Sequence, residues 1–155
     1  MKRFCFLLIF LFAGCKSHQV LDLGTANLNT IGPASIEVNS FGGNITIVVD
    51  ATLNSAKVQV AQRDKMLKRG EEPQKQITWD AFVQNGAQGE MIFVETHANH
   101  NPMKTLSADV TIQAPSIHHV TANTENGDIT IYGVSGQLSL ITSDGNIKVA
   151  TPLVM

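Results

Sequence analysis

The chain has 155 residues, 43% of them apolar, which is enough for one domain with a hydrophobic core and too little for a second independent core. It carries 11 basic and 13 acidic residues, a formal net charge of −2. Lys2 and Arg3 lie in a segment that we expect to be removed, which leaves nine basic residues against 13 acidic ones and a net charge of −4. This acidic balance argues against nucleic acid as a partner.

Residues 1–14 have the layout of a secretory signal peptide, with a basic start, an apolar run from Phe4 to Phe12 and a small-residue end at Ala13 and Gly14. The apolar run is about half of the roughly 20 residues that a membrane-spanning helix needs, so a retained transmembrane anchor is the weaker interpretation. We therefore expect the protein to be exported from the cytoplasm.

The segment LFAGC, which ends at Cys15, resembles the lipobox of bacterial lipoproteins, although Phe12 stands where an aliphatic residue is usual. The resemblance implies cleavage before Cys15 and attachment of lipid, with palmitate among the acyl chains, to this cysteine, which would hold the chain at a membrane. Lys16 follows in place of Asp, which by resemblance to enterobacterial sorting implies the outer membrane. An ordinary signal peptide is the alternative. With Cys5 removed and Cys15 acylated, no thiol remains for a disulfide or a cysteine metal site.

Residues 15–33 are polar and small without a sustained period, and they are interpreted as the lipidated cysteine and a tether. From Ala34 onward, short runs alternate β-branched and polar residues, which is typical of half-buried strands, and Gly, Asn, Asp and Pro separate them as turns. We expect a mainly β domain over residues 34–155. The alternating runs are 36–38, 45–47, 58–60, 110–112, 129–131, 138–140 and 147–149.

One stretch, residues 62–90, departs from this pattern. Asp64 could cap a short helix that Gly70 ends, and the spacing of Trp79, Phe82 and Val83 fits either a second helix or a strand. We expect a helical or irregular insertion that covers one end of the β core. Six of the nine remaining basic residues lie between positions 57 and 75, either as a patch for anionic headgroups or glycans or as a solvated face.

Two phrases near the end of the chain, TENGDITI at 124–131 and TSDGNIKV at 142–149, are nearly the same, and SFGGNITI at 40–47 is a looser third copy around Gly43. A local interpretation makes 126–127 the turn of an antiparallel hairpin. The repetitive interpretation makes each copy the corner of one coil of a β-solenoid, and the 18-residue spacing of Gly127 and Gly145 favours it, because equivalent positions then stack in columns.

The corner residues are interpreted as structural. Asn126-Gly127-Asp128 would stack on Asp144-Gly145-Asn146, so that each carboxylate faces an amide, which can donate to it, instead of a second carboxylate, which would repel it. Calcium would more naturally gather several carboxylates, and the spacing differs from that of calcium-binding β-rolls. We expect no metal and no cofactor.

Residues 107–149, with a strand, Pro115, an alternating run and the two corners, resemble the putative-adhesin β-solenoid domain of bacterial envelope proteins, and residues 36–47 resemble the opening of such domains. The resemblance implies a right-handed β-solenoid without catalytic activity. The last coil has no polar cap, so its edge would be exposed. Either another copy covers that edge by end-to-end self-association, or the sequence is a fragment of a longer protein.

Motifs for chemistry are few. No phosphate-binding loop, zinc-protease helix motif or complete nucleophile elbow occurs. Glu95 and the histidines form a loose metal candidate, in which alternation would place His118 and His119 on opposite faces of a strand; exposed loop histidines are the alternative. Three aspartates of the β part could perform acid–base work on polysaccharides, although each looks like a turn or strand-surface residue. The histidines are His97, His100, His118 and His119, and the aspartates are Asp109, Asp128 and Asp144.

These observations predict a non-catalytic, lipid-anchored protein of the cell envelope that presents a flat repetitive surface to an unidentified glycan or protein ligand. A carbohydrate-active enzyme and a structural or regulatory envelope subunit that binds another protein are the alternatives.

Overall fold

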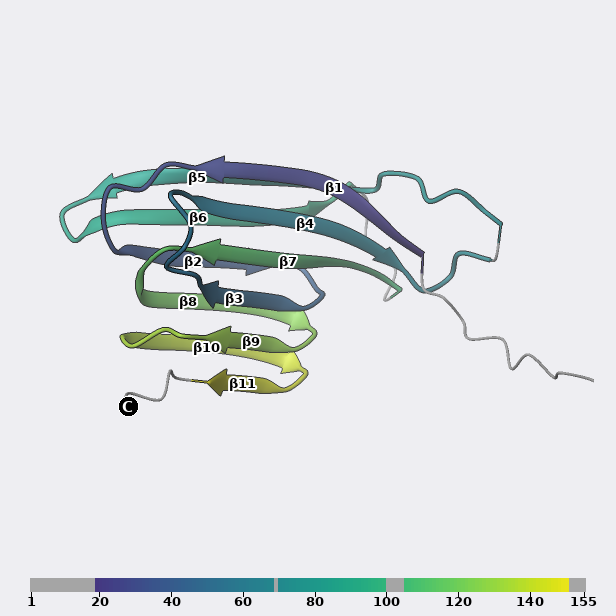
Figure 1. The fold of residues 1–155 in the computed structure, drawn as a ribbon. Coiled ribbons are helices and arrows are strands. Elements are labelled where there is room, and N and C mark those ends of the chain that lie inside the picture. Colours follow the sequence, from purple (N-terminus) through teal and green to yellow (C-terminus); the bar gives the residue numbers. More distant parts are fainter. Residues whose placement is uncertain (1–18, 69, 100–104, 151–155) are drawn as a thin grey trace, which may run out of the picture.

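The computed structural model describes residues 19–68, 70–99 and 105–150, and in them it places eleven β-strands and no helix, which confirms the mainly β class. Figure 1 shows the strands stacked as rungs, with the longer ones at the N-terminal end of the stack and shorter coils toward the C-terminal end. The strands are β1 Gln19–Leu28, β2 Ala34–Ser40, β3 Ile45–Val49, β4 Ala56–Asp64, β5 Ile77–Gly86, β6 Gly89–Ala98, β7 Leu106–Ala114, β8 Ile117–Asn126, β9 Ile129–Tyr132, β10 Gln137–Asp144 and β11 Ile147–Ala150.

The strands form two open sheets that face each other across the core (Figure 1). One sheet has six strands in the order β1-β4-β7-β3-β9-β11, and the other has five in the order β10-β8-β2-β6-β5. Pairing is parallel through most of both sheets and antiparallel where β4 joins β1 and β7 and where β5 joins β6. The fold is therefore a solenoid-like stack at one end with antiparallel strands added at the other.

Each corner passes the chain from one sheet to the other. β2, β8 and β10 belong to the five-stranded sheet, and the strands that directly follow them, β3, β9 and β11, belong to the six-stranded sheet. Within the sheets β8 pairs in parallel with β10 and β9 with β11, 18 residues apart in both cases. The hairpin interpretation of residues 126–127 is therefore wrong, because β8 and β9 lie in different sheets.

Columns of branched aliphatic side chains fill the space between the sheets. Ile45 is in register with Ile129, and Ile47 with Ile131, and all four are fully buried. Burial of each such side chain contributes about 1.5–3 kcal/mol relative to exposure. This stacking is why the Ile-x-Ile element recurs after each corner.

The two ends of the stack differ. At one end the edge strands β1 and β5 approach each other, and the half-buried Trp79 of β5 donates its indole N–H to the carbonyl oxygen of Leu23 at 3.4 Å. At the other end β10 and β11 are the outer described strands of their sheets, and Ile147 and Val149, which continue the buried columns, are 47% and 43% exposed. Of the candidate elements around Trp79, the strand forms and the helix does not.

The tether predicted over 15–33 is wrong for much of its length, because residues 19–28 form β1, which pairs antiparallel with β4. Strict alternation breaks within this strand because the register shifts between Asp22 and Gly24, where the Asp22 carboxylate accepts a hydrogen bond from the Gly24 N–H at 2.9 Å. The folded domain therefore starts at least 15 residues before Ala34.

The short helix predicted between Asp64 and Gly70 is absent from the described part of that segment, which is irregular. Asp64 ends β4, and its carboxylate accepts from the N–H of Met66, two residues on, which closes a turn instead of capping a helix. The following loop is held by the buried Gln62, whose amide donates to the Gln74 carbonyl at 2.7 Å and accepts from the Gln76 N–H at 2.8 Å.

The predicted signal peptide 1–14, Cys15 and His100 lie outside the described residues, as do residues 151–155. In the described part of the chain, no helix is long and apolar enough to cross a membrane.

Candidate functional site

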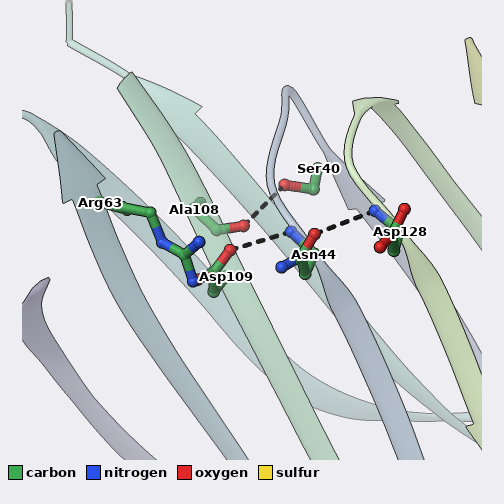
Figure 2. A network of polar contacts seen from close by, with 6 residues as sticks. All are labelled: Ser40, Asn44, Arg63, Ala108, Asp109 and Asp128. Atoms are coloured by element: carbon green, nitrogen blue, oxygen red, sulfur yellow. Dashed lines mark hydrogen bonds and ion pairs between the residues drawn. The ribbon is translucent and has the colours of Figure 1, made fainter. Parts of the chain in front are cut away.

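A row of polar side chains crosses the corner side of the stack, one from each successive layer (Figure 2). The Asp109 carboxylate accepts the backbone N–H of Asn44 at 3.0 Å, and the Asn44 side-chain oxygen accepts the N–H of Asp128 at 3.0 Å. The Asp128 carboxylate then accepts both the backbone N–H of Asn146 at 2.8 Å and its amide at 3.2 Å. Asp and Asn thus alternate from layer to layer, so neighbouring carboxylates are separated by an amide.

This row of alternating Asp and Asn side chains, called the polar ladder below, begins at a cation. The Arg63 guanidinium of β4 donates to one carboxylate oxygen of Asp109, while the other oxygen receives the Asn44 N–H. Both side chains are partly buried, with 34% and 19% exposed, so the pair contributes more than a fully exposed one would. Both oxygens of Asp109 are therefore engaged in holding layers together.

The glycines and hydroxyls of the repeated phrase form two further columns. A Cβ placed on Gly127 would lie 2.3 Å from the carbonyl oxygen of Gly43, and one on Gly145 would lie 2.1 Å from that of Gly127. The Thr124 hydroxyl donates to the Gly43 carbonyl at 3.0 Å, and the Thr142 hydroxyl to the Gly127 carbonyl at 2.9 Å. Close approach of backbones between layers thus requires glycine, and the hydroxyls satisfy the carbonyls that this approach leaves free.

The same corner appears once more in a form that the sequence reasoning missed. Residues 105–112 read TLSADVTI, and they place Ala108 in the glycine column and Asp109 in the polar ladder. Ser40 of β2 donates weakly to the Ala108 carbonyl at 3.5 Å, as Figure 2 shows. The pattern Ser/Thr, two residues, Gly or Ala, then Asp/Asn and two alternating aliphatic residues would have identified this copy.

A groove of about 630 Å³ runs along the corners. Its lining includes the predicted corner residues Gly43, Asn126, Gly127 and Asp144, together with Asp109. The aspartates of the ladder accept backbone N–H groups, which is a structural role and leaves them poorly placed for proton transfer to a ligand.

A second groove, of about 570 Å³, lies on the outer face of the five-stranded sheet. Among its lining residues are Ser35 and Glu37 of β2, Met91 of β6, and Thr121 of β8, and the turn between β5 and β6 borders it. No lysine or arginine is among the described residues that line it. The groove thus combines hydroxyl, amide, imidazole and carboxylate groups with an apolar part that includes Ile36 and Met91.

His118 and His119 both line this second groove, so the expectation that they point to opposite faces is wrong. Ala34 pairs with Ile117 whereas Ser35 pairs with His119, and this β-bulge inserts His118 as an extra residue between the buried positions. A bulge re-aims side chains in this way. The His118 ring contacts the Ser35 hydroxyl at 3.3 Å, and the His119 ring contacts that of Thr121 at 3.4 Å.

The other histidine of the described part, His97, contacts the Glu95 carboxylate at 3.5 Å on β6. Within residues 19–68, 70–99 and 105–150, no three histidine, cysteine or acidic side chains gather closely enough to hold a metal ion. The loose histidine cluster considered from the sequence is therefore not assembled by the described residues.

An aromatic pair adjoins the second groove. Phe93 of β6 is paired with Glu37 of β2 on one side and with Phe82 of β5 on the other, so all three share the outer face. The two rings lie 5.2 Å apart, centre to centre, and Phe82 is 46% exposed. This face therefore combines a partly exposed aromatic pair with a groove that carries both polar and apolar side chains.

These features define a β-solenoid-like domain of two sheets with stacked corners. Residues 6–153 match the Toastrack DUF4097 family, and the chain belongs to that family. A search of the curated proteins gives no match.

Three solved structures are similar to the chain at low sequence identity. A putative cell adhesion protein from Clostridium sporogenes ATCC 15579 has 8% identity and a TM-score of 0.44, over 86% of this chain and 100% of that one. A putative adhesin from Bacteroides fragilis NCTC 9343 has 12% identity and a TM-score of 0.47, over 86% and 55%. A putative adhesin from Parabacteroides distasonis ATCC 8503 has 8% identity and a TM-score of 0.36, over 86% and 57%. The chain spans about half the length of the last two.

Proposed function

We propose that this protein is a non-catalytic, adhesin-like binding protein of the bacterial envelope, anchored by lipid on Cys15, that presents the outer face of its five-stranded sheet to a glycan or protein ligand. The observation that carries the proposal is the groove, which carries polar side chains, beside the exposed Phe82 and its half-buried neighbour Phe93. Exposed aromatic side chains next to a concave surface with polar groups occur at binding sites more often than elsewhere on a protein surface. The corner aspartates serve the fold, which favours binding over catalysis.

The anchoring part of the proposal is tested on cells that produce the full chain. We expect the wild type to sediment with outer-membrane fractions and Cys15→Ala to be released from membranes. Unchanged sedimentation of Cys15→Ala would remove the lipid anchor from the proposal. The outer-membrane assignment depends in addition on Lys16, and Lys16→Asp should then shift the protein toward the inner membrane.

The binding part is tested by the retention of producing cells on surfaces coated with glycans or with envelope and matrix proteins. We expect retention by wild-type cells and loss of retention with Phe82→Ala. Tyr132→Ala is a matched control, since Tyr132 is 38% exposed on the other sheet. Cleavage of a glycan by the wild type that Asp144→Asn abolishes, with the variant still folded, would instead establish the carbohydrate-active enzyme.

A second copy of the chain is the partner that we propose for the open end of the stack. Ile147 and Val149 expose there the apolar columns that are buried one layer earlier, and β10 and β11 are the outermost described strands of their sheets. Such edges pair readily with further strands. The proposal includes right-handed winding of the coils, since crossovers between parallel strands are right-handed in nearly all cases.

A further inference from the structure

We propose that the groove on the outer face of the five-stranded sheet is the site of a neutral oligosaccharide, with Phe82 and Phe93 as its stacking platform. This inference rests on the proposed function and names the class of ligand and the residues that take it. It differs from that function in placing the ligand on particular side chains and in excluding acidic glycans.

The floor of the groove is a continuous row of side chains, one from each of five strands. Strand pairing aligns Gln137, His119, Ser35, Met91 and Gln84 in this order across the sheet. Five strands span four inter-strand spacings, or about 19 Å, at ~4.8 Å each. All five residues line the groove. A floor of this length suits an extended chain of several units better than a compact small molecule.

The bulge in β8 places additional polar side chains in the groove. His118, the inserted residue, lies beside Ser35, and His119 lies beside Thr121 in the next row. Imidazoles, hydroxyls and amides each both donate and accept hydrogen bonds, as sugar hydroxyls do. The groove is thus matched to a ligand that carries many hydroxyl groups.

Charge restricts the ligand further. Glu37 lines the groove, and no lysine or arginine is among the described lining residues. A carboxylate accepts hydrogen bonds from sugar hydroxyls and repels sulfate, phosphate and carboxylate groups. Neutral saccharides therefore fit this site, and acidic ones do not.

The aromatic pair provides the apolar contact. Phe93 is the direct neighbour of Glu37 across the sheet, and Phe82 continues the same row outward. One face of a sugar ring carries only C–H bonds, and it packs on an aromatic ring while its hydroxyls point sideways to polar groups. Glu37 is placed to accept from a sugar that stacks on Phe93.

The test uses the full chain in detergent micelles with ¹⁵N-labelled histidine. Cello-, manno- and maltohexaose are titrated in turn, beside sialylated and sulfated oligosaccharides at equal concentration. We expect at least one neutral hexasaccharide to shift the His118 and His119 signals with saturation, and the acidic ones to leave them unchanged. Phe82→Ala should weaken binding about tenfold or more, and Tyr132→Ala should not change it.

The inference is overturned if no neutral oligosaccharide shifts these signals, if the acidic ones bind more tightly, or if Phe82→Ala binds as well as Tyr132→Ala. Circular dichroism of each variant establishes that it is folded. Retention of producing cells on protein-coated surfaces, with no oligosaccharide binding, would leave the proposed function standing and the glycan site refuted. Absence of both cell retention and oligosaccharide binding would refute the proposed function and the glycan site together.

Discussion

The layer contact at Gly127 can be separated from its backbone conformation by two matched substitutions. A Cβ on Gly127, at φ +141°, would lie 2.3 Å from the carbonyl oxygen of Gly43. Gly89, the first residue of β6, has φ +106°, yet a Cβ there would meet no atom within 4 Å. Gly127→Ala therefore adds strain and a collision, whereas Gly89→Ala adds strain alone.

The magnitudes follow from these two terms. A non-glycine residue at positive φ costs about 1–3 kcal/mol, and the reduced freedom of the unfolded chain returns about 0.4–1 kcal/mol in both variants. The Gly43 oxygen is backbone, so it cannot rotate away, and an extra methyl forced between layers costs about 1–3 kcal/mol more. We expect a loss of about 2–5 kcal/mol for Gly127→Ala and about 1–2 kcal/mol for Gly89→Ala.

Urea denaturation of the full chain, followed by far-UV circular dichroism, measures both losses. Gly145→Ala is a third member of the series, because Gly145 lacks a positive φ while its Cβ would lie 2.1 Å from the Gly127 oxygen, so it reports the collision alone. If Gly127→Ala costs no more than Gly89→Ala, the stacked-corner explanation of the repeated glycine is refuted.

Three further predictions concern hydrogen bonds, pH and the open end. Thr124→Val removes the buried hydroxyl that donates to Gly43, which should lower the free energy of unfolding by about 1–2 kcal/mol in the same urea assay; an unchanged midpoint would contradict this role. The Thr52 hydroxyl and N–H hold the pKa of Asp50 below its ordinary value of 3.8, so this contribution to stability is present at neutral pH and lost as the pH falls below about 4. Carboxyl NMR titration of Thr52→Ala should show the pKa of Asp50 rise toward its ordinary value, and no rise would exclude the hydroxyl as the cause. Val149→Lys should abolish concentration-dependent self-association in sedimentation velocity; association that survives it would place the contact elsewhere.

Much of the repetitive part of the fold could be predicted, because it is determined by residues that lie close together in the sequence. Close packing of backbones needs Gly127 and Gly145, and burial between sheets needs the alternating aliphatic residues after them. Their 18-residue spacing equals the observed register of β8 with β10 and of β9 with β11. The local sequence pattern and the tertiary structure agree here, so the repeat predicts the stacking of the coils.

The remainder depends on register shifts and on partners distant in the sequence. The register shift near Asp22 interrupts the alternation of β1, so the strand is not predicted from its sequence. The bulge at His118 places a histidine on the outer face, where strict alternation would not put it. The groove joins residues from five strands, among them Glu37 and Gln84, that no short motif links. Such a site becomes visible only when the order of the strands is known.

The early start of β1 has a consequence for the reach of the domain. Only residues 16–18 separate Cys15 from Gln19. With lipid on Cys15, the linker between the membrane and the domain would therefore span at most about 14 Å when fully extended. The domain itself then sets how far the protein extends, on the order of the 30–35 Å of its ten-residue strands. With lipid on Cys15, as proposed, the protein would be held close to its membrane and would meet polymers of its own envelope before those of a second cell.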